Sequence, residues 1–94
     1  MEQVYLDNAA TTQIREEVIN EMVNVMHNIY GNPSSSHRYG RSSKSIIETS
    51  RKKIAGYLNV SAGGMLFTSG GTEASNLILR SAVRDLGVTH IITS

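Results

Sequence analysis

The chain has 94 residues, a length that suits one small domain. Its 9 basic and 8 acidic side chains leave a formal net charge of +1, so charge gives no reason to expect nucleic acid or an anionic membrane as a partner. The sequence contains no cysteine, which excludes a disulfide framework and a thiolate metal site. It has neither an apolar run near the ~20 residues that span a bilayer nor the pattern of a secretory signal. We therefore expect a cytoplasmic protein.

The first part of the chain is predicted to be a short strand that leads into an amphipathic helix. Residues 4–6 form an apolar run that ends at a turn, as a brief strand does. Thr11 and Thr12 are the predicted caps of the helix that follows. Its apolar residues recur at the spacing of one helix face: Ile14, Val18, Met22, Met26 and Ile29. The helix should end before Gly31, because Gly-Asn-Pro interrupts helices.

The polar segment 31–43 is the first candidate functional segment. Pro33 biases Asn32 toward extended angles, and the serines that follow bond to local backbone groups. A structured loop is therefore favoured here over a helix. His37 and Arg38 are neighbours in this loop, where they would be able to meet an anionic substrate. A solvated surface loop has the same composition, so the segment alone leaves both interpretations open.

The rest of the chain alternates between predicted helices and strands. A helix is expected from about Ser42 to Leu58, with Glu48 and Lys52 spaced for an ion pair. A strand over residues 65–68 then feeds a helix from about Thr72 to Leu86. Gly87 should stop that helix before a buried strand over residues 88–93. The expected core contacts of the last helix are Ala74, Leu77, Ile78, Ala82 and Val83. His27 and His90 are interpreted as structural, since no cluster has the spacing of metal ligands.

The strongest chemical signal lies where the second strand meets the last helix, in residues 66–76. Free backbone N–H groups and the positive end of a helix dipole attract a phosphate. Gly70 and Gly71 can adopt angles that other residues resist, and they let the anion approach the main chain. Thr72 adds a hydroxyl donor, and Glu73 suits the first turn. An ordinary turn with Thr72 as N-cap has the same sequence. The pattern is neither the dinucleotide fingerprint nor the P-loop, so NAD or ATP bound in the usual way is not expected.

Three segments together resemble one family, residues 5–12, 31–40 and 67–76, and residues 90–94 follow in the expected place. Their order and spacing resemble the cysteine desulfurases, pyridoxal-phosphate enzymes of the class V aminotransferase group. The resemblance implies an α/β fold, here the incomplete N-terminal part of a mostly parallel seven-stranded sheet with helices on both faces. Residues 1–60 would form an N-terminal arm with two helices. Residues 61–94 would begin the large cofactor-binding domain.

The resemblance also implies a chemistry. Such enzymes use pyridoxal 5'-phosphate, held by a lysine, to remove sulfur from L-cysteine. The products are L-alanine and an enzyme persulfide, which supplies iron–sulfur cluster assembly or thiolation through an acceptor scaffold protein. The residues that would hold the cofactor phosphate are Gly70, Gly71 and Thr72. Those that would lie near the substrate are Ala10, Asn32, His37 and Arg38, the last three at the active site of the partner subunit in a homodimer.

The chain also departs from the family. Members are roughly four times as long, well beyond a single small core. The cofactor-binding lysine and the persulfide cysteine of the family would both lie further along. We therefore expect an N-terminal fragment that is inactive alone and is unfolded, rearranged or ordered only by companion chain. The alternatives are another class V enzyme, such as a selenocysteine lyase or an aminotransferase, and a non-catalytic phosphate-binding module.

Overall fold

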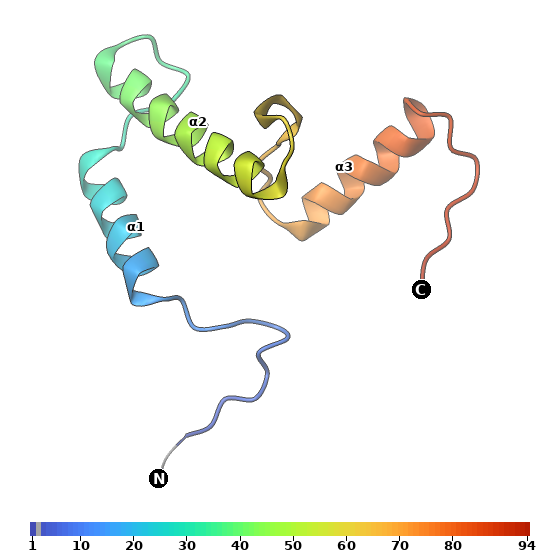
Figure 1. The fold of residues 1–94 in the computed structure, drawn as a ribbon, viewed down its shortest axis with the longest axis horizontal. Coiled ribbons are helices and arrows are strands. Elements are labelled where there is room, and N and C mark those ends of the chain that lie inside the picture. The colour runs from blue at the N-terminus through green and yellow to red at the C-terminus, as the bar shows by residue number, and fades with distance from the viewer. Residues whose placement is uncertain (2) are drawn as a thin grey trace. The chain divides into compact units, whose positions relative to one another are not determined.

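The computed structural model describes Met1 and residues 3–94. Its elements are three α-helices, α1 (Glu16–Asn28), α2 (Arg38–Leu58) and α3 (Gly71–Arg84), and one turn of 3-10 helix, η1 (Ala62–Gly64) (Figure 1). The contacts divide the chain into two units, Met1–Lys53 and Ile54–Ser94. Each unit is therefore described by itself.

Helix α1 confirms the helix predicted from the apolar spacing, but its predicted cap is wrong. The N-cap residue is Arg15, and its side chain makes no capping hydrogen bond. Thr11 and Thr12 lie several residues upstream of the first turn, so neither hydroxyl caps it. Two acidic residues in the first turn, Glu16 and Glu17, and His27 in the last turn suit the helix dipole instead.

Helix α2 begins at Arg38, four residues earlier than Ser42, the predicted start. The prediction that residues 38–41 belong to the loop is therefore wrong. Its predicted ion pair is also replaced, because Glu48 pairs with Arg51 at 3.3 Å, three residues along the same face, and not with Lys52. Pairs at either spacing lie on one helix face, and each stabilises a helix by about 0.2–0.5 kcal/mol.

Helix α3 agrees with its prediction to within two residues at each end. Gly87 has a φ of +67°, a left-handed conformation that favours glycine. The amide of Val88 then donates to the carbonyl of Ala82 at 3.0 Å, which turns the chain back over the end of the helix. The sequence-based prediction that Gly87 ends this segment is confirmed.

The three predicted strands do not form in the described part of the chain: residues 4–6, 65–68 and 88–93 have no ladder partner there. Met65 has extended backbone angles, with φ −98° and ψ 124°. Extended angles alone do not make a strand, because ladder hydrogen bonds come from a neighbouring strand. The prediction that residues 88–93 are buried is wrong as well, since Ile92 is 99% exposed. The parallel sheet therefore stays a prediction.

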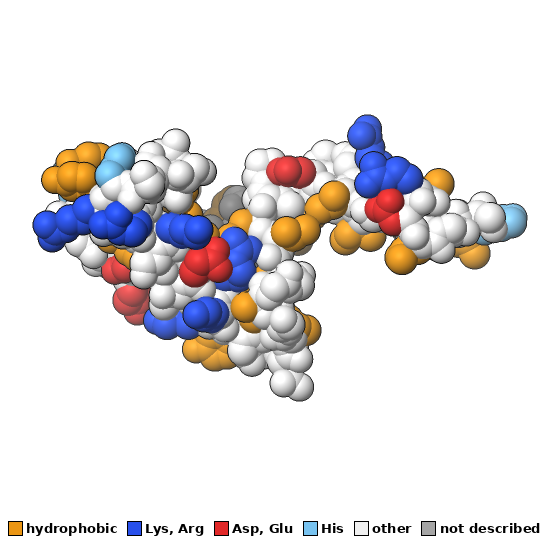
Figure 2. Space-filling model, turned by 90° about the horizontal axis from the view of Figure 1, so that it is seen from above, with side chains coloured by type: hydrophobic (Ala, Val, Ile, Leu, Met, Phe, Trp, Pro, Cys, Tyr) orange, Lys and Arg blue, Asp and Glu red, His pale blue; other side chains and the backbone are white. Residues whose placement is uncertain are grey.

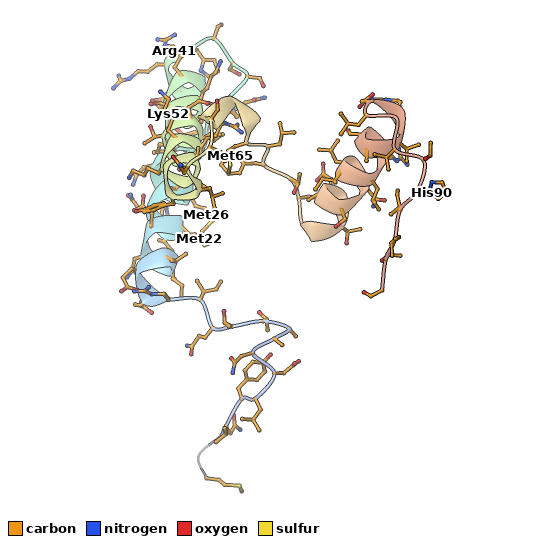
Figure 3. All side chains as sticks on the ribbon, turned by 45° about the vertical axis from the view of Figure 1, so that its right-hand side comes forward. Met22, Met26, Arg41, Lys52, Met65 and His90 are labelled. Atoms are coloured by element: carbon orange, nitrogen blue, oxygen red, sulfur yellow. The ribbon has the colours of Figure 1, made fainter. Side chains whose placement is uncertain are left out.

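Few described residues are buried: Gly40, Ser43 and Ala55. The predicted apolar faces have helical spacing, but much of their surface is uncovered. Figure 2 shows hydrophobic side chains on the outside of the molecule, and in Figure 3 Met22 and Met26 project from α1 into open space. Of the predicted core of α3, Ala74 and Ala82 are half-buried. The exposed members of the two predicted faces are Ile14, Val18, Met22, Met26, Leu77, Ile78 and Val83.

We expect the isolated 94-residue chain to lose its helices gradually on heating, without a sharp transition. Cooperative unfolding requires a shared apolar core, and the helices here bury too little apolar surface to supply one. Circular dichroism at 222 nm and scanning calorimetry measure this directly. A single calorimetric peak accompanied by the spectrum of a β-sheet would contradict the expectation.

Candidate functional site

The start of α3 leaves backbone donors open. Gly70 is the N-cap residue, so the interpretation of Thr72 as N-cap is wrong. The first hydrogen bond of the helix runs from the amide of Ala74 to the carbonyl of Gly70, at 3.2 Å. The amides of Gly71 and Thr72 precede that bond and have no acceptor among the described residues. The Thr72 hydroxyl has none there either.

The two glycines at this helix start leave the main chain uncovered. Gly70 has φ 171° and ψ −179°, an extended conformation that any residue adopts, and the φ of Gly71 is not in the left-handed range. The expectation that they take angles other residues resist is therefore wrong. A Cβ atom added to either glycine would meet no atom within 4 Å. The absence of a side chain at both positions leaves room for an anion to reach the amides.

Glu73 is bound by the residue before the N-cap. The amide and the hydroxyl of Ser69 each donate to its Oε2 atom at 2.6 Å. The hydrogen bond from the Ser69 hydroxyl, and after it that from the amide, lowers the pKa of Glu73 below its usual value. This acidic group is thus occupied by Ser69 and does not fill the donors of Gly71 and Thr72. We call residues 69–73 the phosphate cradle.

The second candidate segment is the loop before α2 together with the first residue of that helix, and it holds three of the predicted substrate-proximal residues. Asn32 accepts the amide of Ser34 on Oδ1 at 2.9 Å and the amide of Ser35 on its carbonyl at 3.0 Å. His37 accepts the amide of Gly40 on Nδ1 at 3.3 Å. Arg38 is exposed, and its side chain has no hydrogen bond or ion pair in the described part of the chain. The prediction that this loop is structured is confirmed for residues 31–37.

Two glycines allow the loop to lie directly on the first turn of α2. A Cβ atom on Gly31 would stand 2.5 Å from the carbonyl carbon and oxygen of Tyr39. A Cβ atom on Gly40 would stand 2.3 Å from the carbonyl oxygen of Ser35 and 2.6 Å from that of Asn32. No side chain fits at either position, because real Cβ atoms do not approach backbone atoms so closely. The sequence pattern did not predict these contacts between the loop and the helix.

Two side chains that the sequence did not single out complete the start of α2. Arg41 donates through Nη1 to the carbonyl of Ser36, and Ser43 donates through its hydroxyl to the carbonyl of Tyr39 at 3.2 Å. Arg41 is labelled at the loop end of α2 in Figure 3. The spacing of Arg41 from Ser36 has no familiar motif that would reveal the contact. A serine within a helix commonly donates to the carbonyl four residues earlier, so the sequence could have predicted the bond from Ser43 to Tyr39.

Ala10, the remaining predicted site residue, lies in an exposed turn. Its amide donates to the carbonyl of Asp7 at 3.1 Å. Ala10, Asn32, His37 and Arg38 belong to the unit Met1–Lys53, whereas the phosphate cradle belongs to the unit Ile54–Ser94. The predicted residues thus lie in three local segments, which are the turn at Ala10, the segment from Asn32 to Arg38, and the phosphate cradle.

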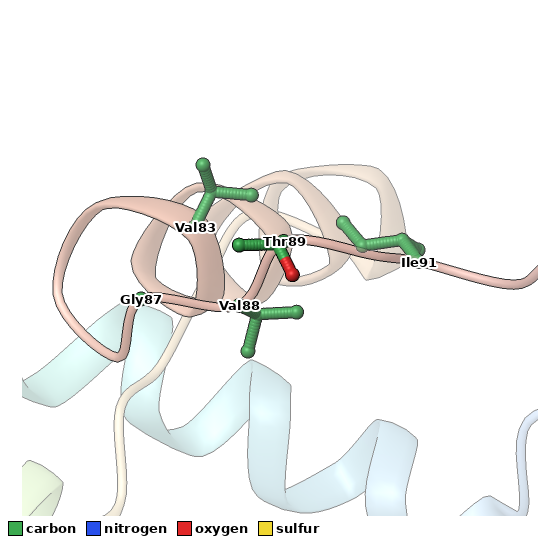
Figure 4. A pocket seen from close by; sticks show the side chains of 5 residues that line it. All are labelled: Val83, Gly87, Val88, Thr89 and Ile91. Atoms are coloured by element: carbon green, nitrogen blue, oxygen red, sulfur yellow. The ribbon is translucent and has the colours of Figure 1, made fainter.

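Apolar hollows flank α3 but contain none of the predicted site residues. One, of about 540 Å³, lies between the end of the helix and the segment that follows it (Figure 4). Another, of about 210 Å³, lies between the start of the helix and the segment that precedes it. Their linings include Val83, Val88 and Ile91 in the first and Leu66, Leu77 and Ile78 in the second. Both lie where the sequence predicts strands beside this helix.

Two other kinds of site are absent from the described residues. No group of three or more histidine or acidic side chains there is placed to hold a metal ion. None of the helices in the same part of the chain is long and apolar enough to cross a membrane. The phosphate cradle and the Gly31–Gly40 loop are therefore the two candidate segments.

Comparison with known proteins identifies the family. The family model for class V aminotransferases matches residues 4–94. The chain belongs to this family. A cysteine desulfurase IscS of Methanosarcina thermophila is 46% identical over 97% of the chain and 23% of its own length. The corresponding protein of Dictyoglomus turgidum is 43% identical over 98% of the chain and 24% of its own length. A selenocysteine lyase of Bos taurus is 42% identical over 93% of the chain and 20% of its own length.

The chain spans a quarter or less of the length of these relatives. No solved structure matches it. Class V aminotransferases and cysteine desulfurases are pyridoxal-phosphate enzymes, and the phosphate cradle offers what such a cofactor needs. Open amides, an open hydroxyl and uncovered glycines fit a phosphate group at a helix start.

Replacing Glu73 by Gln should weaken the start of α3 and remove its response to acid. Because the folded state lowers the pKa of Glu73, the stabilisation is complete above the usual carboxyl range and is lost as the pH falls through the lowered value. The Cα chemical shifts of Gly71–Glu73, followed by NMR from pH 7 to pH 2, measure it. Glu21→Gln is the control, since Glu21 lies within α1. If these chemical shifts changed with pH in the same way in the wild type and the Glu73→Gln variant, Glu73 would not be the group that stabilises the start of α3.

A pair of glycines in α2 gives a matched test of the loop contacts. Gly40→Ala should disrupt the loop by about 1–3 kcal/mol, because the new Cβ atom overlaps two carbonyl oxygens. Gly56→Ala should stabilise α2 by up to ~1 kcal/mol, because its Cβ meets nothing within 4 Å and alanine favours helix. Helix content at 222 nm and the Tyr30–Tyr39 contact in NMR spectra report the two outcomes. An equal gain of helix content in both variants would contradict the close contact of Gly40 with the two carbonyl oxygens.

Proposed function

We propose that this chain is the part of a pyridoxal-phosphate-dependent cysteine desulfurase that holds the phosphate of the cofactor. One observation carries the proposal: the start of α3 has open amides and an open hydroxyl at the place where the sequence predicts a phosphate site. Membership of the class V family, together with 43–46% identity to cysteine desulfurases, supports the choice of ligand. The whole protein would release L-alanine and sulfur from L-cysteine.

Each residue of the phosphate cradle has a distinct part in this proposal. The amides of Gly71 and Thr72 donate to the phosphate, the Thr72 hydroxyl adds a third donor, and Gly70 keeps the approach clear. The α3 dipole adds a positive potential at the same point. Ser69 holds Glu73 away from these donors, which spares the phosphate a competing carboxylate. The bound cofactor supplies the electron sink that permits cleavage of the carbon–sulfur bond.

The Gly31–Gly40 loop is proposed to serve the substrate. Arg38 suits the carboxylate of an amino acid, because a guanidinium group binds carboxylates through two parallel hydrogen bonds and this one has no partner in the described chain. Asn32, His37 and Ala10 would lie near the same substrate, with the loop reaching the active site of the other subunit in a homodimer. In this arrangement residues 1–60 form the arm and residues 61–94 begin the cofactor-binding domain.

The sulfur would leave through residues outside this sequence. The chain contains no cysteine, so the thiol that receives the sulfur, like the cofactor-binding lysine, would come from elsewhere in a longer protein. An acceptor scaffold protein for iron–sulfur cluster assembly or thiolation, and a cytoplasmic location, complete the proposal.

Selenocysteine lyase is the second candidate function. The 42% identity to the bovine lyase supports it about as well as the desulfurase matches support the first. Both functions need the same phosphate cradle, so the cradle does not separate them. Assays of the full-length enzyme with L-cysteine and L-selenocysteine do, because a lyase releases alanine only from the selenium compound. A non-catalytic phosphate-binding module would release alanine from neither.

The proposal predicts that Thr72→Ala weakens binding of pyridoxal phosphate to the full-length protein. Loss of a hydrogen bond to a charged group costs about 1–2 kcal/mol, which raises the dissociation constant roughly 5- to 30-fold. Equilibrium titration of the apoenzyme measures the change. Thr72→Ser keeps the hydroxyl and should retain most of the affinity, and Ser75→Ala on the next turn of α3 is the control. Unchanged affinity in Thr72→Ala would remove Thr72 from the phosphate site.

A further inference from the structure

His37 occupies the position that caps α2. Its carbonyl accepts the amide of Arg41 at 3.1 Å, as the carbonyl of an N-cap residue does. Its ring atom Nδ1 accepts the amide of Gly40 at 3.3 Å, and Gly40 is the third residue of the helix. Serine, threonine, aspartate and asparagine make this same side-chain bond in most capped helices. The imidazole of His37 takes their place.

The geometry fixes the proton on the ring. A nitrogen that accepts a hydrogen bond must carry a lone pair, so Nδ1 is unprotonated and a neutral ring has its hydrogen on Nε2. We propose that His37 is a positioning residue: it caps α2 in the Nε2–H tautomer and thereby sets where Arg38 stands. In this state the outward nitrogen of His37 is a hydrogen-bond donor. It has no lone pair with which to take a proton from a substrate.

Neighbouring groups hold the ring in place. The ring of Tyr39 meets that of His37 edge-on, with centroids 6.3 Å apart and an interplanar angle of 71°. Tyr39 in turn stacks on Tyr30, with centroids 5.7 Å apart and an angle of 27°. The close contacts of Gly31 and Gly40 seat the loop on the same turn. The ring contacts, the close backbone approach and the capping hydrogen bond thus all hold the segment in which His37 lies.

The cap explains why α2 begins earlier than the sequence predicts. With His37 at the N-cap, Arg38 is the first helical residue and its direction follows the helix. Without the cap, the first turn has no side-chain acceptor for the amide of Gly40 and frays. The claim that His37 caps α2 stands on the geometry alone. Its consequence for substrate binding through Arg38 rests on the proposed function.

The first experiment is NMR of the ¹⁵N-labelled 94-residue chain. An N–H···N hydrogen bond transmits a scalar coupling, so a cross-peak is expected between the Gly40 amide nitrogen and Nδ1 of His37. Long-range ¹H–¹⁵N spectra should place the ring hydrogen on Nε2. A hydrogen on Nδ1, or a Gly40 amide that exchanges as in an unstructured peptide, would overturn the proposal.

Three variants separate capping from other roles. His37→Ala should speed amide exchange at Gly40 about fivefold, the effect of losing a typical cap. His37→Asn should restore slow exchange, because asparagine is a good cap. His27→Ala, in the last turn of α1, should leave Gly40 unchanged. If His37→Asn exchanged as fast as His37→Ala, the capping role would be wrong.

Kinetics of the full-length enzyme test the consequence for substrate. A positioning role predicts that His37→Ala raises KM for L-cysteine and that His37→Asn returns it near the wild-type value. Should His37→Asn protect Gly40 yet lose as much kcat as His37→Ala, His37 would act in chemistry and the positioning role would be refuted. Absence of desulfurase activity in the wild type would overturn the proposed function, while the NMR readouts would still decide the cap.

Discussion

Unsatisfied amide donors at helix starts are the constraint on which both candidate segments depend. The first amides of any helix lack an acceptor within the helix, so each start must find one elsewhere or leave its donors open. At α2 the ring of His37 supplies an acceptor for Gly40. At α3 the N-cap is a glycine without a side chain, and the donors of Gly71 and Thr72 stay open. A helix start whose amides have acceptors is held in place, whereas one whose amides lack acceptors can bind an anion.

Glycine has opposite uses at these two starts. Gly31 and Gly40 are required because the loop and the helix lie too close for a side chain. Gly70 and Gly71 have ample room around them, and their lack of a side chain exposes the main chain. The first pair contributes to packing and the second to access. The sequence predicted the second pair as part of a phosphate site for two reasons, unusual backbone angles and access of an anion to the main chain. The first reason is wrong, since neither glycine adopts a left-handed conformation, and the site itself stays a prediction.

The sequence predicted those features that depend on near neighbours. Apolar spacing identified α1 and α3 to within two residues at each end, because helix hydrogen bonds join residues close in sequence. The N-caps were missed, since a histidine cap has no common motif and Gly70 has no side chain with which to cap. Strand formation depends on residues that are distant in sequence. The local pattern of residues 65–68 and 88–93 therefore could not decide whether these segments form strands.

The same distinction explains which of the predicted features form in this chain. The phosphate cradle needs only the interactions among residues 69–74, so it forms even where the helix beside it has an exposed apolar face. Residues 88–93 differ, because their apolar and β-branched side chains stabilise a fold only when they are buried in a sheet, which requires residues distant in sequence. The curated relatives are about four or more times as long as this chain. Local hydrogen bonds thus set the open donors at the start of α3, whereas the apolar side chains around this helix depend on contacts with residues distant in sequence.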